Sequence, residues 1–171
     1  MMARMADTRT RPRREDFWHD ADAPTPTSVI PGATVIVTDA SNQLLLMIER
    51  TDNGNFALPG GVFQLGETIA ETAVRECEEE TRYVIEIDEL VGTFTNPAAV
   101  VQFNTEHPEV RQEFSLLYEA HIVGGEERAS SESRQVVWVE NDADVLTQLP
   151  MASSMRYRLA VWNDEPRPFL G

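Results

Sequence analysis

The hydrophobic positions of the chain predict several strands, one long central helix and a helical C-terminal region. Residues 31–39 (PGATVIVTD) and 43–50 (QLLLMIER) have the β-branched and apolar composition of strands. Because residues 39–42 between them have turn chemistry, we predict that these two strands form a hairpin. Further strands are predicted at residues 83–95, with a break near Asp88, and at residues 111–123 and 135–140.

The central helix is predicted to run from Thr68 to about Arg82, directly after a glycine turn. Its apolar arc contains the single cysteine, Cys77, for which we expect a buried position rather than a catalytic role. The C-terminal region is predicted to be helical at residues 142–149 and 151–162. One face of the last helix would carry Met155, Leu159 and Trp162.

The polar segments set the expected domain boundaries. Residues 1–28, basic at first and then rich in Asp and Pro, are predicted to form an irregular N-terminal arm. Residues 29–165 would form one domain, followed by a tail at residues 166–171. Residues 96–110 lack periodicity and are predicted to form a long loop. The mixture of elements predicts an α/β fold, an α/β/α sandwich around a mixed β-sheet.

Composition narrows the range of partners. The 171 residues carry a formal net charge of −15, which argues against a nucleic acid or an anionic membrane surface as the main partner. An anionic substrate would therefore need a metal ion or a local arginine cluster. The chain contains no lysine, so lysine chemistry is excluded. Neither a secretory signal nor a membrane-spanning run is present, and we expect a cytoplasmic protein.

Three carboxylates share one face of the predicted central helix. At about 100° per residue, Glu76, Glu79 and Glu80 fall within an arc of about 100°. They would repel one another unless a cation lay between them, and a hard divalent cation prefers oxygen ligands. The alternative is a solvated acidic face that is supported by the i,i+4 pairing of Arg75 with Glu79.

The wider spacing of charged and glycine positions favours the metal site. The pattern consists of Gly61, Glu67, Arg75-Glu76 and Glu79-Glu80. At average residue usage, these six positions coincide by chance about once in ten million starting points. The stretch from Gly61 to Tyr83 resembles the Nudix box of the Nudix hydrolases, and a looser likeness covers roughly residues 30–160. It departs from the family pattern at Arg82, where the family has Gly.

The resemblance implies a Mg²⁺ or Mn²⁺ site and a catalytic role for its ligands. Its metal ligands would be Glu76, Glu79, Glu80 and the carbonyl oxygen of Gly60. Family members also use an acidic residue from a later loop as the general base or as an extra ligand. Glu132 is the first choice for that role and Glu113 is the second, and an ordinary surface acid is the alternative for each.

Other residues are expected to support the site or to contact the substrate. Glu67 and Arg75 would be structural, with Arg75 holding Glu67 and Glu79 by charge-assisted hydrogen bonds. Arg50 and Arg111 are candidates for contacting substrate phosphates, together with Glu113 in the same region.

These observations lead to two hypotheses for function. The first is a Mg²⁺-dependent hydrolase of a pyrophosphate bond in a nucleoside diphosphate derivative, such as ADP-ribose, a nucleotide sugar or a nucleoside triphosphate. The second is a non-catalytic nucleotide-binding module on the same scaffold, favoured only by Arg82. Both imply a small-molecule nucleotide as the ligand, with no nucleic acid or membrane partner, and a homodimer is possible.

Overall fold

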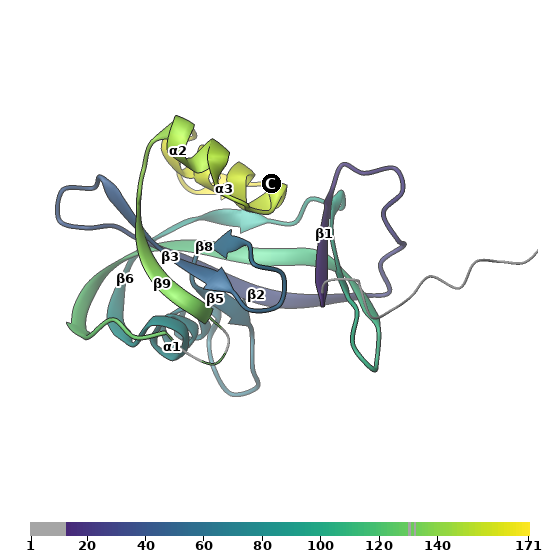
Figure 1. Ribbon diagram of the computed structural model, residues 1–171, viewed down its shortest axis with the longest axis horizontal. Coiled ribbons are helices and arrows are strands. Elements are labelled where there is room, and N and C mark those ends of the chain that lie inside the picture. Colours follow the sequence, from purple (N-terminus) through teal and green to yellow (C-terminus); the bar gives the residue numbers. More distant parts are fainter. Residues whose placement is uncertain (1–12, 130, 132) are drawn as a thin grey trace, which may run out of the picture.

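In the computed structural model the chain is described at residues 13–129, 131 and 133–171, where it forms two β-sheets and three helices (Figure 1). The seven-stranded sheet contains β1 (Arg14–Trp18), β2 (Ser28–Val37), β5 (Gly60–Val62), β6 (Tyr83–Phe94), β7 (Ala99–Phe103), β8 (Glu109–Gly125) and β10 (Phe169–Leu170). The three-stranded sheet contains β3 (Leu44–Arg50), β4 (Phe56–Ala57) and β9 (Ser133–Glu140). The helices are α1 (Ile69–Thr81), α2 (Ala143–Gln148) and α3 (Ser153–Asp164).

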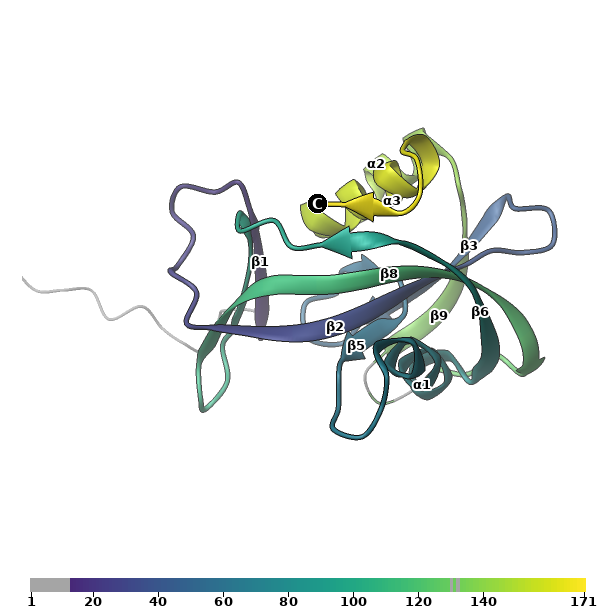
Figure 2. The same ribbon diagram turned by 180° about the vertical axis from the view of Figure 1, so that it is seen from behind.

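The long strand β8 organises the larger sheet. It pairs in parallel with all of β2, and on its other edge it pairs antiparallel with β7 and then with β6. The sheet is therefore mixed, as the sequence predicts. Helix α1 lies on one side of this sheet, and α2 and α3 lie on the other (Figures 1 and 2). No helix in the described parts of the chain is long and apolar enough to cross a membrane.

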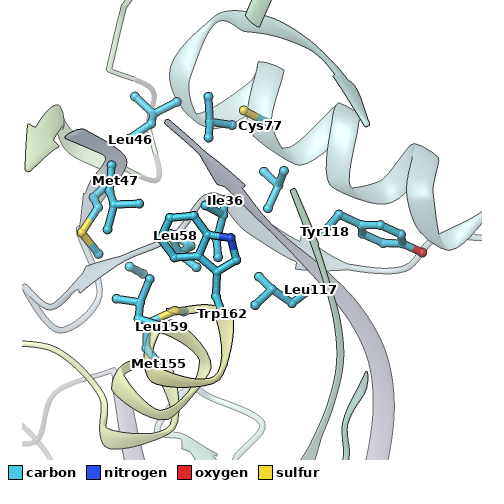
Figure 3. Close-up of a cluster of buried hydrophobic side chains, with 14 of the residues drawn as sticks. Ile36, Leu46, Met47, Leu58, Cys77, Leu117, Tyr118, Met155, Leu159 and Trp162 are labelled. Carbon is cyan, nitrogen blue, oxygen red and sulfur yellow. The ribbon is translucent and has the colours of Figure 1, made fainter. Parts of the chain in front are cut away.

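Hydrophobic side chains from both sheets and from the helices form the core (Figure 3). In β2, Val35, Ile36 and Val37 are completely buried, and the strand contacts both α1 and β3 of the second sheet. The expected face of α3 is confirmed, since Met155, Leu159 and Trp162 are 7%, 3% and 9% exposed. Cys77 is buried in α1, and burial raises the pKa of its thiol to about 12, so the thiolate nucleophile is suppressed at neutral pH.

The boundaries of α1 agree with the sequence prediction. Thr68 caps the N-terminus by accepting a hydrogen bond from the Glu71 backbone N–H, and the Glu71 carboxylate accepts one from the Thr68 backbone N–H. At the other end Arg82 has φ 68° and ψ 6°, the left-handed conformation that ends a helix. The helix therefore stops where the family pattern has Gly, and Arg82 adopts the strained conformation that Gly adopts freely.

Replacing Arg82 by glycine is expected to stabilise the protein. The left-handed conformation costs a residue with a Cβ about 1 kcal/mol, and glycine removes that cost. For a domain of this size, the melting temperature should rise by about 2–4 °C in a thermal scan. The predicted gain would be contradicted if Arg82→Gly melted below the wild-type protein.

The predicted hairpin of residues 31–50 is wrong, because its two strands belong to different sheets. The turn itself forms as expected, with the Asp39 carboxylate accepting hydrogen bonds from the backbone of Gln43 and Leu44. Beyond it, a single bridge joins Thr38 to Leu45 among the described residues. Instead, β2 pairs along its edges with β8 and β5, and β3 pairs with β9 and β4.

The expected loop at residues 96–110 contains a strand, and so does the expected irregular arm. Strands β7 and β1 pair antiparallel with each other at the edge of the larger sheet, from Arg14 opposite Phe103 to Trp18 opposite Ala99. Each strand is only five residues long, so neither shows a clear period in the sequence. In β6, the expected break near Asp88 is a shift of register between Ile87 and Glu89.

Candidate active site

A cleft begins at the glycine turn of β5 and follows the inner face of β8 towards β1 and β7. The strand register places the alternate residues Arg111, Glu113 and Ser115 of β8 on this face. Helix α3 forms the opposite wall through Ser154, Met155 and Arg158. The same sheet face that is apolar in the core is thus polar and charged in the cleft.

Two of the three glutamates that are predicted metal ligands are buried beside the glycine turn. Glu76 is 9% exposed and Glu80 is 3% exposed, whereas the side chain of Glu79 is 59% exposed. The backbone N–H of Gly60 donates a hydrogen bond of 2.9 Å to Oε2 of Glu80. A Cβ added at Gly61 would lie 2.4 Å from Cδ of Glu76, so only glycine leaves room for that carboxylate. The turn and the helix are therefore fitted to each other at this point.

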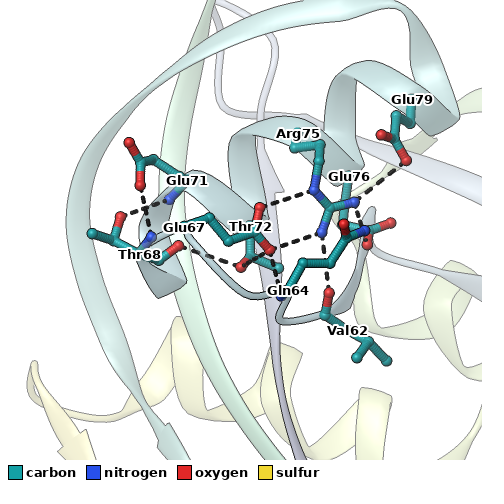
Figure 4. Close-up of polar contacts among 9 residues, drawn as sticks. All are labelled: Val62, Gln64, Glu67, Thr68, Glu71, Thr72, Arg75, Glu76 and Glu79. Atoms are coloured by element: carbon teal, nitrogen blue, oxygen red, sulfur yellow. Dashed lines mark hydrogen bonds and ion pairs between the residues drawn. The ribbon is translucent and has the colours of Figure 1, made fainter.

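Arg75 connects the glutamates to the loop that precedes the helix (Figure 4). Its Nε and Nη2 each donate a hydrogen bond of 3.0 Å to the carboxylate of Glu67. Nη1 donates to Glu76 at 2.8 Å and to Glu79 at 3.4 Å, and Nη2 also donates to the carbonyl of Val62. One guanidinium thus fixes the loop and two glutamates in a common frame.

The pairing with Arg75 changes the ionisation of Glu67. Hydrogen bonds from Arg75, and then from Thr72 and Gln64, lower the pKa of Glu67 from 4.5 to about 2. Because the folded pKa is depressed, the contribution of this carboxylate to stability is present above pH 4.5 and is lost as the pH falls through about 2.

Replacing Arg75 by methionine should raise the pKa of Glu67 back towards its ordinary value of 4.5, because the main cause of the depression is removed. A carbon-detected NMR titration of the side-chain carboxyl groups measures this directly. An unchanged pKa of Glu67 in Arg75→Met would show that Arg75 does not control this carboxylate.

The donor atoms beside the turn fit a hard divalent cation in their chemistry. Glu76, Glu79, Glu80 and the carbonyl of Gly60 offer oxygen atoms only, as Mg²⁺ and Mn²⁺ prefer. The carboxylates of Glu76 and Glu80 are buried, and a Cβ at Gly61 would occupy the space of the Glu76 carboxylate. Within residues 13–129, 131 and 133–171, no three His, Cys, Asp or Glu side chains are already arranged to hold a metal ion by themselves.

The three predicted substrate contacts all line the cleft, and each has an ionic partner. Arg50 donates two hydrogen bonds to Asp52, and Arg111 donates one of 2.5 Å to Glu109. Hydrogen bonds from Arg111 and Ser28 lower the pKa of Glu109 to about 2, so that carboxylate is charged at neutral pH. Glu113 accepts a hydrogen bond from Arg158 of α3.

Glu132, the first choice for the general base, lies outside the described residues. Its neighbour Ser133 is buried at the start of β9, where its hydroxyl donates a hydrogen bond of 3.0 Å to the carbonyl of Glu80. The beginning of β9 therefore contacts the C-terminal end of α1.

Sequence reasoning missed Arg14 and Arg158, which also line the cleft. Arg158 is 4% exposed, and its Nη2 lies 3.3 Å from Oε2 of Glu113. Arg14 pairs with Asp16 and lies 3.9 Å from Oε1 of Glu113. A signal for Arg158 was present, because it occupies the apolar stripe of α3 together with Met155, Leu159 and Trp162. A charged residue on such a stripe predicts a buried ionic contact.

Comparisons with known proteins agree with this geometry. A family model for the NUDIX domain matches residues 29–159. A MutT-like protein of Streptomyces ambofaciens is 37% identical over 123 residues, which are 72% of this chain and 70% of that protein. An ADP-ribose pyrophosphatase of Methanocaldococcus jannaschii is 30% identical over 102 residues, 58% of this chain and 55% of that protein. The crystal structure of a MutT protein from Methanosarcina mazei has a TM-score of 0.64 at 17% identity, covering 85% of this chain and 99% of that one.

The chain therefore belongs to the NUDIX family, and its fold is the mixed α/β fold of that family. It is a Nudix hydrolase, an enzyme that acts on pyrophosphate bonds. The family generally uses a divalent metal ion.

Proposed function

We propose that the protein hydrolyses a pyrophosphate bond in a nucleoside diphosphate derivative with the help of Mg²⁺ or Mn²⁺. ADP-ribose, nucleotide sugars and nucleoside triphosphates are the candidate substrates. The proposal rests chiefly on the burial of Glu76 and Glu80 beside the Gly60–Gly61 turn at one end of a charged cleft. Arg75 already pairs with Glu76, and a divalent cation beside the turn would further stabilise the charged forms of these neighbouring carboxylates.

The residues divide into roles along the cleft. Glu76, Glu79, Glu80 and the carbonyl of Gly60 would hold the metal ion at the turn. When bound, the ion shields phosphate oxygens and lowers the pKa of a coordinated water. Arg75 keeps Glu76 and Glu79 in position through the hydrogen bonds described above.

Other residues would bind the substrate and activate the attacking water. Arg50 and Arg111 would bind substrate phosphates by exchanging a carboxylate partner for a phosphate oxygen. Glu132 remains our first choice for the general base. Glu113 is the second choice, and it lies in the cleft.

A substrate panel tests this function. Protein stripped of metal is assayed with ADP-ribose, nucleotide sugars, dinucleoside polyphosphates and nucleoside triphosphates, with and without added Mg²⁺. We expect hydrolysis of at least one compound, which stops in EDTA and returns with Mg²⁺. Binding of these compounds without any hydrolysis would favour the non-catalytic nucleotide-binding module instead.

A further inference from the structure

Four arginines line the cleft, and each has a carboxylate partner. Three of these ion pairs join residues that are two positions apart on one strand or its end: Arg14–Asp16, Arg50–Asp52 and Arg111–Glu109. The fourth, Arg158–Glu113, joins helix α3 to strand β8 at a longer distance of 3.3 Å. The most deeply buried of the four guanidinium groups thus has the longest contact with its partner.

Two of these arginines also carry a buried hydrogen-bond donor without an acceptor. Within the described part of the chain, the Nε atoms of Arg111 and Arg158 are both covered and neither has a hydrogen-bond partner. A buried donor without an acceptor destabilises the structure, and more so when it belongs to a charged group. Both residues line the same cleft, so a ligand there can supply the missing acceptors once the guanidinium groups turn towards it.

Arg158 lies where the cleft meets a second cavity. Glu113, Ser154 and Arg158 line both. The wall of the second cavity includes the aromatic residues Trp18, Phe94 and Tyr157, and the guanidinium carbon of Arg158 lies 5.7 Å from the ring centre of Phe94. In the same cleft, the guanidinium carbon of Arg111 lies 4.8 Å from the ring centre of Phe103. The aromatic faces hold both cations in place, while their hydrogen-bonding edges contact the carboxylates of Glu109 and Glu113, for which an anionic ligand can substitute.

We propose that Arg158 and Arg111 form an anion-binding subsite that takes a phosphate group of the substrate without a metal ion. The subsite is separate from the glutamates of α1 and belongs to the wall formed by α3 and β8. This proposal rests on the proposed function. It adds a second phosphate contact, which is made by a helix outside the Gly61–Tyr83 stretch. Glu113 is the competing internal anion that the phosphate displaces from Arg158.

A purely structural ion pair is the competing explanation for Arg158 and Glu113. In that case, removing either partner would have the same effect, because each variant breaks the same link between α3 and β8. In an anion subsite the two variants act in opposite directions. Losing Arg158 removes the phosphate ligand, whereas losing the charge of Glu113 frees the guanidinium for phosphate.

The test measures binding of inorganic pyrophosphate by calorimetry in the presence of EDTA, so that neither metal nor turnover contributes. Arg158→Met should weaken binding by about tenfold or more, the usual value of a charged hydrogen bond. Glu113→Gln should tighten it several-fold. The control is Arg134→Gln, which removes one positive charge from an exposed ion pair with Glu49 and should change affinity less than about twofold.

Thermal unfolding checks that each variant is folded. If Arg158→Met does not fold, Arg158→Lys replaces it, because lysine keeps the charge but loses the planar fork, and weaker binding is again expected. The proposal is overturned if neither Arg158 variant weakens pyrophosphate binding, or if Glu113→Gln weakens it as much as Arg158→Met. Since metal is absent, failure here is distinct from absence of hydrolysis in the substrate panel.

Discussion

Replacing Glu79 by glutamine is expected to lower kcat by about 10²–10³-fold while leaving the fold intact. The side chain is 59% exposed and makes one long hydrogen bond to Arg75, so its loss removes little packing. As a metal ligand it supplies charge that a neutral amide does not, and losses of this size follow when one preorganised electrostatic group is removed. The measurement is steady-state hydrolysis of the substrate found in the panel, together with a thermal scan.

The neighbouring Glu78 provides the matched control. It is exposed on the same helix and belongs to the same residue type, but it lies outside the set of predicted ligands. Glu78→Gln should retain wild-type turnover, because the change in net charge is identical and only the position differs. Glu79 would be excluded as a metal ligand if Glu79→Gln hydrolysed substrate as fast as Glu78→Gln.

Replacing Gly61 by alanine should reduce kcat/KM by about 100-fold without unfolding the protein. The new Cβ would lie 2.4 Å from Cδ of Glu76 and 2.5 Å from both carboxylate oxygens. Because the obstructing atoms are the far end of a side chain, the carboxylate moves rather than the backbone. A displacement of about 1 Å in a positioned group is enough for a loss of this size.

Gly124 offers a control for the loss of glycine itself. The nearest atom to a Cβ at that position is 4.0 Å away, on Val84, and the residue lies far along β8 from the cleft. Gly124→Ala should therefore keep its activity. Full activity in Gly61→Ala would mean that the position of the Glu76 carboxylate at the turn does not matter for the reaction.

The sequence predicted the central helix and its surroundings well because the signals there are local. The helix begins at a capping threonine, Thr68, and ends at Arg82, which has a left-handed backbone. Each of these features depends only on residues a few positions away in the chain. The contact of Arg75 with Glu67 spans eight residues, but it is still local, because Glu67 lies just before the helix and Arg75 lies two helical turns into it. Charge spacing on a single helix thus indicates which carboxylates Arg75 can reach, and the structure places both Glu76 and Glu79 within its hydrogen-bonding range.

The rest depended on contacts between distant segments. Strands β2 and β3 look like a hairpin locally, yet their long hydrogen-bonded partners, β8 and β9, come from residues 109–140. Strands β1 and β7 form because they pair with each other across more than 80 residues, which short apolar runs do not reveal. Arg158 reaches Glu113 only once α3 has docked on the sheet.

Binding of Mn²⁺ to metal-stripped protein, followed by electron paramagnetic resonance, tests the central claim most directly. The claim is that Glu76, Glu79 and Glu80 hold the catalytic cation beside the Gly60–Gly61 turn. We predict that the wild-type protein binds Mn²⁺ and that the triple variant Glu76→Gln, Glu79→Gln, Glu80→Gln loses at least about tenfold in affinity. Equal Mn²⁺ affinity in the two folded proteins would contradict this account.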